Sequence, residues 1–267
     1  MSLAESYTAW PPSAERAVGI REDACAADPS GPPARWVYGK AAIGFVMRGT
    51  FEYASGDRSV FAAPGAIILG NADEHFSVRH VDTRGNRRLV VTFDHALLDE
   101  VANDVGAAPR FGAIAVPPGR VATRMFALMR ALERGDSDIL YPLAQAALTA
   151  ERPDTREHIS ARDRRRIEDA VRHIESNYDQ PCPLQALSEL AGLSRFRFAR
   201  VFSAIVGESP NQYLINTRVR AAADRLTTTT APIAQIAFDV GFNDISHFYA
   251  RFRDAFGCAP RQWRLRG

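Results

Sequence analysis

The sequence predicts an α+β protein, with an antiparallel β-barrel or sandwich in the N-terminal half and an all-α domain in the C-terminal half. Three observations predict this division. Short apolar runs alternate with turn residues between Trp36 and Phe93, whereas from residue 160 onward apolar residues recur at helical spacing. A polar stretch at 151–160 separates these two patterns and is the predicted linker.

Composition argues against two classes of protein. No apolar run approaches the roughly 18 residues that a membrane-spanning helix needs, and Met1–Trp10 has neither the basic start nor the apolar stretch of a secretory signal. Cys25, Cys182 and Cys258 lie far apart, so they predict neither a disulfide framework nor a CxxC site. We therefore expect a cytoplasmic protein with no membrane partner.

The net charge of +2 is unevenly distributed along the chain. Residues 1–150 contain 15 Arg and Lys against 17 Asp and Glu, a balance of −2. Residues 151–267 contain 18 against 14, a balance of +4. A mildly acidic half joined to a basic half favours a regulator that binds nucleic acid over an enzyme.

The N-terminal half begins with a leader and continues with short strands. Residues 1–35 are interrupted by Pro11-Pro12, Pro29 and Pro32-Pro33, so they are predicted to form a flexible arm. Turn residues flank six apolar runs, and each run is a predicted strand: Ala41–Met47, Phe51–Ala54, Val60–Ala62, Ala66–Leu69, Phe76–Val81 and Leu89–Phe93. Six short strands with close turns predict the barrel or sandwich.

The remainder of this half is predicted to be mainly helical. Asp94 is placed to cap a short helix through Val101, and Phe111–Val116 is one further strand-like run. Val121–Arg134 and Ile139–Ala150 carry apolar residues at helical spacing, so a helix is predicted over each.

The C-terminal half contains a helix-turn-helix pattern at about 184–206. A longer helix with a capped start at Ser160 precedes it. The pattern itself has a short helix, a turn at Gly192, and a second helix that Ser194 caps. The predicted buried face of the second helix falls at i, i+3, i+4 and i+7: Phe198, Val201, Phe202 and Ile205. Its opposite face is predicted to enter a major groove.

The same pattern recurs at about 232–256. Its turn is at Gly241, and its core residue Phe248 follows the corresponding Phe198 by 50 residues. A helix from about Asn211 to Leu226 links the two motifs and spans about 20 Å at roughly 1.5 Å per residue. Successive major grooves lie about 34 Å apart, so this spacing suits two recognition helices that bind the same face of one duplex.

The most specific stretch is Gly241–Phe248, which reads GFNDISHF. It continues through Arg251, Phe252, Arg253, Phe256, Gly257 and Pro260. Together with Leu187–Leu193 and residues from Phe198 to Arg218, it resembles the AraC/XylS-type transcriptional regulators. The resemblance implies a seven-helix DNA-binding domain at 161–267 and, at 36–150, a cupin-like ligand-sensing β-barrel with dimerising helices.

The resemblance, carried over residue by residue, also implies base-reading positions. Those of the first motif fall on Phe196, Ala199 and Arg200, and those of the second on Ser246, Tyr249 and Ala250. Many members have Arg where Ala250 stands, so base readout is expected mainly through Arg200, with Arg197 as a further candidate. Arg251 is not expected to substitute, because one residue rotates a helix by about 100°. The second motif is then expected mainly to contact phosphates. The complete set of predicted DNA-binding residues is Arg195, Phe196, Arg197, Ala199, Arg200, Ser246, Tyr249, Ala250, Arg251 and Arg253.

Acidic and histidine residues in the barrel leave a second hypothesis open, a metal-dependent cupin enzyme with a DNA-binding tail. The candidate ligands are Asp73, Glu74, His75, His80 and His95. No His-x-His occurs, however, and His75 and His80 are expected on opposite faces of one strand. We therefore expect neither a metal nor a cofactor.

Other classes of function have less support. Cys25 could accept an alkyl group as in DNA-repair proteins with a related DNA-binding domain, but their zinc-holding cysteine cluster is absent from this sequence. No G-x-S-x-G, Walker loop or G-x-G-x-x-G motif occurs, so no catalytic residue is predicted. A ligand-free architectural DNA binder is a third hypothesis, distinguished by its lack of sequence preference.

These patterns together predict a sequence-specific transcription factor, with no enzymatic activity, that responds to an unidentified small-molecule effector. The expected partners are double-stranded promoter DNA, RNA polymerase and a second copy of the chain, which is expected to contact the helices at Val121–Ala150. Activation is the commoner mode in the family that the sequence resembles, so an activator is expected. Effector binding is expected to act through the 151–160 linker.

Overall fold

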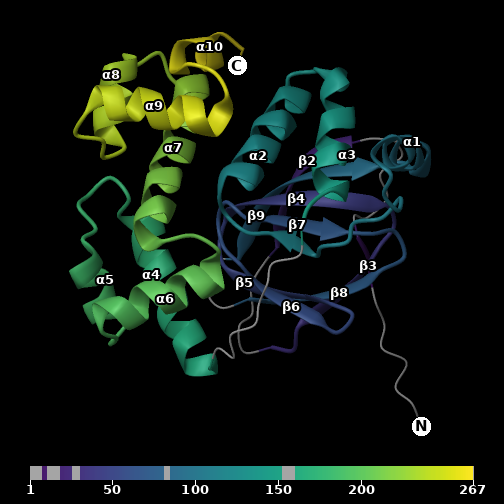
Figure 1. The fold of residues 1–267 in the computed structure, drawn as a ribbon, viewed down its shortest axis with the longest axis horizontal. Coiled ribbons are helices and arrows are strands. Elements are labelled where there is room, and N and C mark those ends of the chain that lie inside the picture. The colour runs from purple at the N-terminus through teal and green to yellow at the C-terminus, as the bar shows by residue number, and fades with distance from the viewer. Residues whose placement is uncertain (1–7, 11–18, 26–30, 81–84, 152–159, 267) are drawn as a thin grey trace. The chain divides into compact units, whose positions relative to one another are not determined.

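The computed structural model describes residues 8–10, 19–25, 31–80, 85–151 and 160–266. The chain divides into two compact units. The first unit contains residues 1–116 and 136–153, and the second contains residues 117–135 and 154–267. Over the described residues, all strands belong to the first unit, while the second is helical (Figure 1). Of the predicted linker, residues 152–159 lie outside the described residues.

The first unit contains two five-stranded β-sheets. One has the order β1 (Thr8–Trp10), β3 (Ala34–Tyr38), β8 (His75–His80), β5 (Phe51–Ser55) and β6 (Arg58–Ala62). The other has the order β10 (Ala115–Val116), β7 (Ile67–Gly70), β4 (Ala41–Arg48), β9 (Asn86–Phe93) and β2 (Gly19–Cys25). Neighbouring strands are antiparallel except β1 and β3, which are parallel. The predicted antiparallel β architecture is therefore confirmed, as a sandwich of two sheets.

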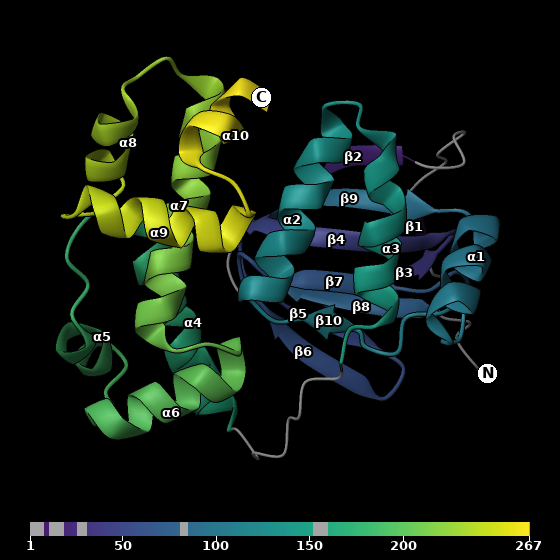
Figure 2. The ribbon, with the colours of Figure 1, turned by 45° about the horizontal axis from the view of Figure 1, so that its top comes forward.

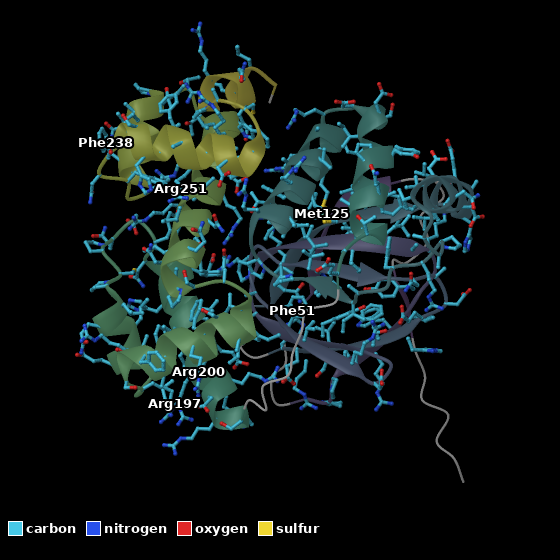
Figure 3. All side chains as sticks on the ribbon, in the orientation of Figure 1. Phe51, Met125, Arg197, Arg200, Phe238 and Arg251 are labelled. Carbon is cyan, nitrogen blue, oxygen red and sulfur yellow. The ribbon has the colours of Figure 1, made fainter. Side chains whose placement is uncertain are left out.

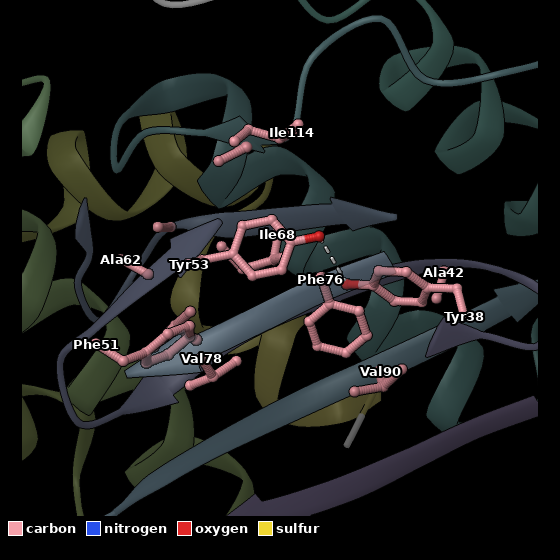
Figure 4. Close-up of a cluster of buried hydrophobic side chains, with 13 residues drawn as sticks. Tyr38, Ala42, Phe51, Tyr53, Ala62, Ile68, Phe76, Val78, Val90 and Ile114 are labelled. Carbon is pink, nitrogen blue, oxygen red and sulfur yellow. Dashed lines mark hydrogen bonds between the residues drawn. The ribbon is translucent and has the colours of Figure 1, made fainter. Parts of the chain in front are cut away.

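An apolar core between the two sheets holds the sandwich together (Figure 4). The Tyr38 and Phe76 rings stack with centroids 4.2 Å apart, and the Tyr38 and Tyr53 hydroxyl oxygens are hydrogen-bonded at 3.0 Å. The Tyr53 hydroxyl lies 3.4 Å from the Leu69 carbonyl oxygen, to which it donates. A Cβ at Gly70 would lie 2.0 Å from the Tyr38 ring, so this close packing requires glycine there.

Most of the predicted strands agree with the structure. The six predicted runs correspond to β4 through β9 with ends that differ by at most three residues, and residue 81 lies outside the described residues. Along β5 buried and half-buried residues alternate, which is the period of two that predicts a strand. Of the run Phe111–Val116, only Ala115–Val116 forms a strand.

The prediction of a flexible arm over residues 1–35 is wrong for two whole strands, and residues 34 and 35 begin a third, β3. Residues 8–10 form β1 and pair with β3, while residues 19–25 form β2 and pair along their whole length with β9. Both pairings join segments that lie far apart in the sequence. Each strand is placed by hydrogen bonds to a distant partner, so the local sequence does not reveal it. The prolines of the leader predicted a loop instead.

Helices complete the first unit. They are α1 (His95–Val105) and α3 (Leu140–Leu148), the latter preceded by the 3-10 turn η1 (Ser137–Ile139). Asp94 caps α1 as predicted, since its side chain accepts a hydrogen bond from the Leu97 backbone nitrogen at 2.9 Å.

The predicted helix Val121–Arg134 is present as α2 (Arg120–Glu133). The predicted domain at 36–150 includes this helix, whereas in the structure it belongs to the second unit. A face of α2 contacts helices of that unit, as described below. The chain passes from the first unit to the second between residues 153 and 154, within the predicted linker, so only the assignment of residues 117–135 differs.

The rest of the second unit consists, over its described residues, of seven helices, as the resemblance implied. They are α4 (Ala161–Ser176), α5 (Leu184–Leu190), α6 (Arg195–Val206), α7 (Pro210–Thr228), α8 (Ile233–Asp239), α9 (Ile245–Phe256) and α10 (Pro260–Arg266). In Figures 1 and 2, α6 lies near one end of the long helix α7 and α9 lies nearer its other end. No helix among the described residues is both long and apolar enough to cross a membrane.

Candidate nucleic-acid interface

The first helix-turn-helix motif consists of α5, a turn at Gly192 and α6. Gly192 has a φ of 60°, a left-handed conformation that favours glycine. The Ser194 side chain accepts a hydrogen bond from the Arg197 backbone nitrogen and so caps α6. Phe198 and Phe202 are fully buried with ring centroids 5.6 Å apart, as the helical spacing predicted. Their burial fixes which face of α6 points to solvent.

The outward face of α6 carries the five predicted residues of the first motif. Arg195, Phe196, Arg197 and Arg200 are exposed, and Ala199 is half-buried. Figure 3 shows Arg197 and Arg200 on the same side of this helix. Phe196 is 79% exposed, which is unusual for a phenylalanine and suits contact with a sugar or a thymine methyl group.

An acidic residue of α4 holds Arg197 in place. Its guanidinium donates to Asp163 Oδ2 at 2.9 Å, and Arg166 lies 3.5 Å from the other carboxylate oxygen. The hydrogen bond from Arg197 is the main cause that lowers the pKa of Asp163. Asp163 was not among the residues predicted for this site. In the structure it binds α6 to α4 through Arg197, which gives this arginine a structural role.

The second motif consists of α8, a turn at Gly241 and α9. Gly241 has a φ of 94°, and a Cβ there would lie 2.9 Å from Arg218 Nε and from two backbone carbonyl oxygens. Glycine is therefore required at this turn for both conformation and space. An aromatic core supports α9, with Phe248 and Phe252 fully buried and 5.6 Å apart between ring centroids.

The predicted residues of α9 include fewer arginines than those of α6. Ser246, Ala250 and Arg253 are exposed, whereas Tyr249 and Arg251 are half-buried. Tyr249 lies against the Phe248 ring at 5.7 Å between centroids. Arg251, labelled in Figure 3, donates from Nε to His247 Nε2 at 3.1 Å along its own helix. This contact agrees with the expectation that Arg251 does not replace an arginine at position 250.

A single helical scaffold carries both motifs. The helix α7 has 19 residues, so it spans about 28 Å, which is longer than the sequence predicted. Tyr213, Thr217 and Arg220 of α7 each donate to one oxygen of Glu175 on α4 at 2.7 to 3.0 Å. The Arg218 guanidinium donates to the carbonyl oxygens of Tyr178 and Gln180 at 2.6 and 3.0 Å. These bonds fix the scaffold on which α6 and α9 are displayed.

The candidate metal ligands of the first unit do not come together. His75 is exposed and His80 is buried, so they lie on opposite faces of β8 as their spacing predicted. Glu74 Oε2 accepts a hydrogen bond from Asn71 at 2.9 Å, and its Oε1 pairs with Arg58 at 3.6 Å. Over the described part of the chain, no three His, Cys, Asp or Glu residues are grouped to hold a metal ion. The Cys25 side chain lies outside the described residues.

A group of buried polar side chains in the sandwich was not predicted. Asn86 and Arg88 are each 4% exposed and lie at alternate positions of β9, on the same face as Val90, which belongs to the core between the sheets. The Arg88 guanidinium lies 5.8 Å from the Phe51 ring centroid, and the buried His80 ring lies 6.4 Å from the same ring. Among the described residues, neither polar side-chain atom of Asn86 has a hydrogen-bond partner. A buried amide without partners is unfavourable, so the Asn86 side chain suits hydrogen bonding to a polar ligand or to water.

Two family models match the chain. One, described as a helix-turn-helix domain, matches residues 187–266, and the other, described as an AraC-like ligand binding domain, matches residues 20–149. The regulatory protein SoxS of Escherichia coli (strain K12) is 30% identical over 100 residues, which cover 38% of this chain and 94% of SoxS. The first match covers both helix-turn-helix motifs, and the second covers most of the first unit together with α2.

Other similar proteins share mainly the helical region. The HTH-type transcriptional regulator ArgR of Pseudomonas aeruginosa is 29% identical over 99 residues, which cover 37% of this chain and 30% of that protein. The first curated relatives are matched over only 27% to 35% of their own lengths. A crystal structure of an AraC-type transcriptional regulator from Chromobacterium violaceum aligns with a TM-score of 0.37 and 28% identity, over 40% of this chain and 95% of that one.

Proposed function

Because the chain belongs to the AraC family of helix-turn-helix transcriptional regulators, we propose that it is a ligand-responsive activator that binds promoter DNA in the cytoplasm. It acts as a homodimer and recruits RNA polymerase. The family consists of regulators and not of enzymes, so no catalytic residue is assigned.

One observation carries the DNA-binding proposal: α6 and α9 present outward faces from a single helical scaffold. The helix α7 between them spans about 28 Å, which is close to the roughly 34 Å between successive major grooves. Both helices also have capped N-termini, at Ser194 and Asp244. Since the N-terminal residues of a recognition helix contact base edges, the caps set the start of each reading face.

The two motifs have different tasks in this proposal. Arg200 is exposed on α6 and reads a guanine through a bidentate contact, with Phe196 against a thymine methyl group or sugar. On α9 the small side chains of Ser246 and Ala250 leave base contacts weak, so Arg253 contacts a phosphate and positions the second motif. Affinity therefore comes from both motifs, and sequence discrimination comes mainly from the first.

The effector contacts the buried polar group of the sandwich in this proposal. Asn86 supplies an amide whose donor and acceptor bond to no group in the described part of the chain, and Arg88 supplies a cation that is almost fully buried. These groups favour a small polar molecule with a hydrogen-bonding or anionic group over a purely apolar one.

Selection of bound duplexes from a random DNA library tests the proposed function. The wild type is expected to enrich a motif with two boxes about one helical turn apart. Arg200→Ala is expected to lose the base preference of one box, and that box is then assigned to α6. If the wild type enriches no motif with or without candidate effectors, the chain is not a sequence-specific regulator.

A further inference from the structure

The helix α2 packs in one unit of the protein, yet both of its ends continue into the other. The segment 117–135 belongs to the second unit, with the helices that carry the reading faces. Before it the chain runs through β10, and after it through η1 and α3, all of the first unit. The helix α2 is therefore connected to the first unit through the chain at both of its ends, but it packs against helices of the second unit.

This segment contacts the C-terminal ends of both reading helices. Pro117 lies directly against Gly207, the residue that ends α6, because a Cβ on Gly207 would be 2.4 Å from the Pro117 Cβ. Arg120 pairs with Asp254 in the last turn of α9 at 2.9 Å. Since bases are read by the N-terminal halves of such helices, these contacts leave the reading faces accessible.

Apolar contacts add to the attachment at α9. The Phe126 ring lies 6.3 Å from that of Phe256, and Phe256 lies 4.5 Å from the Trp263 ring of α10. The Arg134 guanidinium lies 5.3 Å from the centroid of Trp263. All three aromatic rings are at least nine-tenths buried. Phe126 thus extends the aromatic core of the second helix-turn-helix motif.

An ion pair fixes α2 on the scaffold helix α7. Arg130 donates to Asp224 Oδ1 at 2.9 Å and to Glu133 Oε2 at 2.6 Å. The Arg130 side chain is only 20% exposed, so solvent screens these interactions less than on an open surface. Burial acts to lower the pKa of Arg130, but Glu133 and Asp224 outweigh it and raise that pKa.

We propose that residues 117–134 transmit the effector signal, by setting the position of α9 relative to α6. This inference rests on the proposed function and names its regulatory element. A change in the first unit reaches residues 117–134 through two covalent connections, and the contacts with α6, α7, α9 and α10 carry it to the reading helices. The predicted linker at 151–160 provides one further covalent connection.

A charge swap of the Arg130–Asp224 pair tests the proposal in the full-length chain. The probes are the selected two-box duplex and a one-box duplex that keeps the α6 box and scrambles the other. Asp224→Arg is expected to weaken binding of the two-box duplex by about fivefold or more, since couplings between sites commonly fall between 5- and 150-fold. Binding of the one-box duplex is expected to change less than twofold. Adding Arg130→Asp to Asp224→Arg is expected to restore the two-box affinity to within about twofold of the wild type.

The pair Arg225–Asp239 supplies a matched control. It also begins on α7, its atoms are 3.4 Å apart, and it joins α7 to α8 without touching α2. Asp239→Arg changes the charge of the protein by the same amount as Asp224→Arg. It therefore measures how much the added positive charge alone strengthens binding of the duplex. If Asp224→Arg changes both duplexes by the same factor as Asp239→Arg, residues 117–134 do not set α9 and the proposal is overturned. Failure of the wild type to bind any duplex instead contradicts the proposed function.

Hydrogen exchange gives a second readout that does not depend on affinity. Coupling is reciprocal, so binding of the two-box duplex is expected to change exchange in the first unit at α3 as well as in α2. Asp224→Arg is expected to abolish the change at α3 and the double swap to restore it. Unchanged exchange at α3 in the wild type overturns the proposal. If Asp224→Arg does not fold, the exposed pair Arg120–Asp254 is swapped instead, with the same expected outcomes.

Discussion

Substitution of Arg197 by alanine distinguishes a residue that supports α6 from one that reads DNA. The Arg197 guanidinium lies 2.9 Å from Asp163 Oδ2, and its side chain is 55% exposed while that of Asp163 is 10% exposed. A hydrogen bond between charged groups contributes about 1.5–3 kcal/mol, but solvent at the Arg197 side reduces this to about 1 kcal/mol. Asp163 retains Arg166 at 3.5 Å after the substitution. Arg197→Ala is therefore expected to lower the free energy of unfolding by about 1 kcal/mol.

The same substitution is expected to leave sequence discrimination intact. Urea unfolding measures the stability change, and titration of the selected duplex against single-base variants measures discrimination. Arg200→Ala is the comparison, and it is expected to lose about 1–3 kcal/mol at one base pair, or roughly 5- to 150-fold. Arg197→Ala is expected to shift all duplexes by one common factor. The reasoning is refuted if Arg197→Ala selectively removes the preference at one base pair, because Asp163 then does not hold it away from the bases.

Two further predictions concern buried polar groups. Burial raises the pKa of Glu208 to about 7 from 4.5, so its ionisation opposes folding. Its stabilising contribution is complete below pH 4.5 and is lost as the pH rises through 7. Relative to Glu208→Gln, the wild type is expected to lose about 3 kcal/mol of unfolding free energy from pH 4.5 to 8, and parallel urea profiles contradict this. In a thermal-shift screen of small polar molecules, a true effector at about 100 times its Kd is expected to raise the Tm by about 5 °C or more. Asn86→Leu is expected to abolish that shift, while Asn71→Leu, at a residue bonded to Glu74 and Phe111, is the control that keeps it.

Local periodicity predicted much of the fold. The strands β4 through β9 follow from short apolar runs with turn residues between them, and α6 follows from Phe198 and Phe202 one turn apart after a capping serine. These signals lie within a few residues of one another, so they are visible in the sequence. The strands β1, β2 and β3 were missed, because each pairs with a strand that lies far along the chain.

The candidate site was predicted in part. The outward positions of α6 and α9 follow from the opposite, buried faces, and exposure of Arg195, Phe196 and Arg200 agrees with that reasoning. The bond between Arg197 and Asp163 joins residues 34 positions apart on different helices. No spacing rule relates such a pair, so only the packing of α4 against α6 could place Asp163 beside the reading face.

By itself, the sequence determined that two helix-turn-helix motifs follow a β domain, because helix periods, caps and turn glycines are properties of short segments. It also determined which face of each reading helix is buried. The tertiary structure alone decided that α2 belongs with the DNA-binding helices, since the Arg130–Asp224 bond spans 94 positions. It likewise decided that Asp163 holds Arg197 and which polar groups lie inside the sandwich. These features depend on contacts between segments that are distant in the sequence. The free energy of such contacts depends on the three-dimensional arrangement, and no periodic pattern in the sequence predicts them.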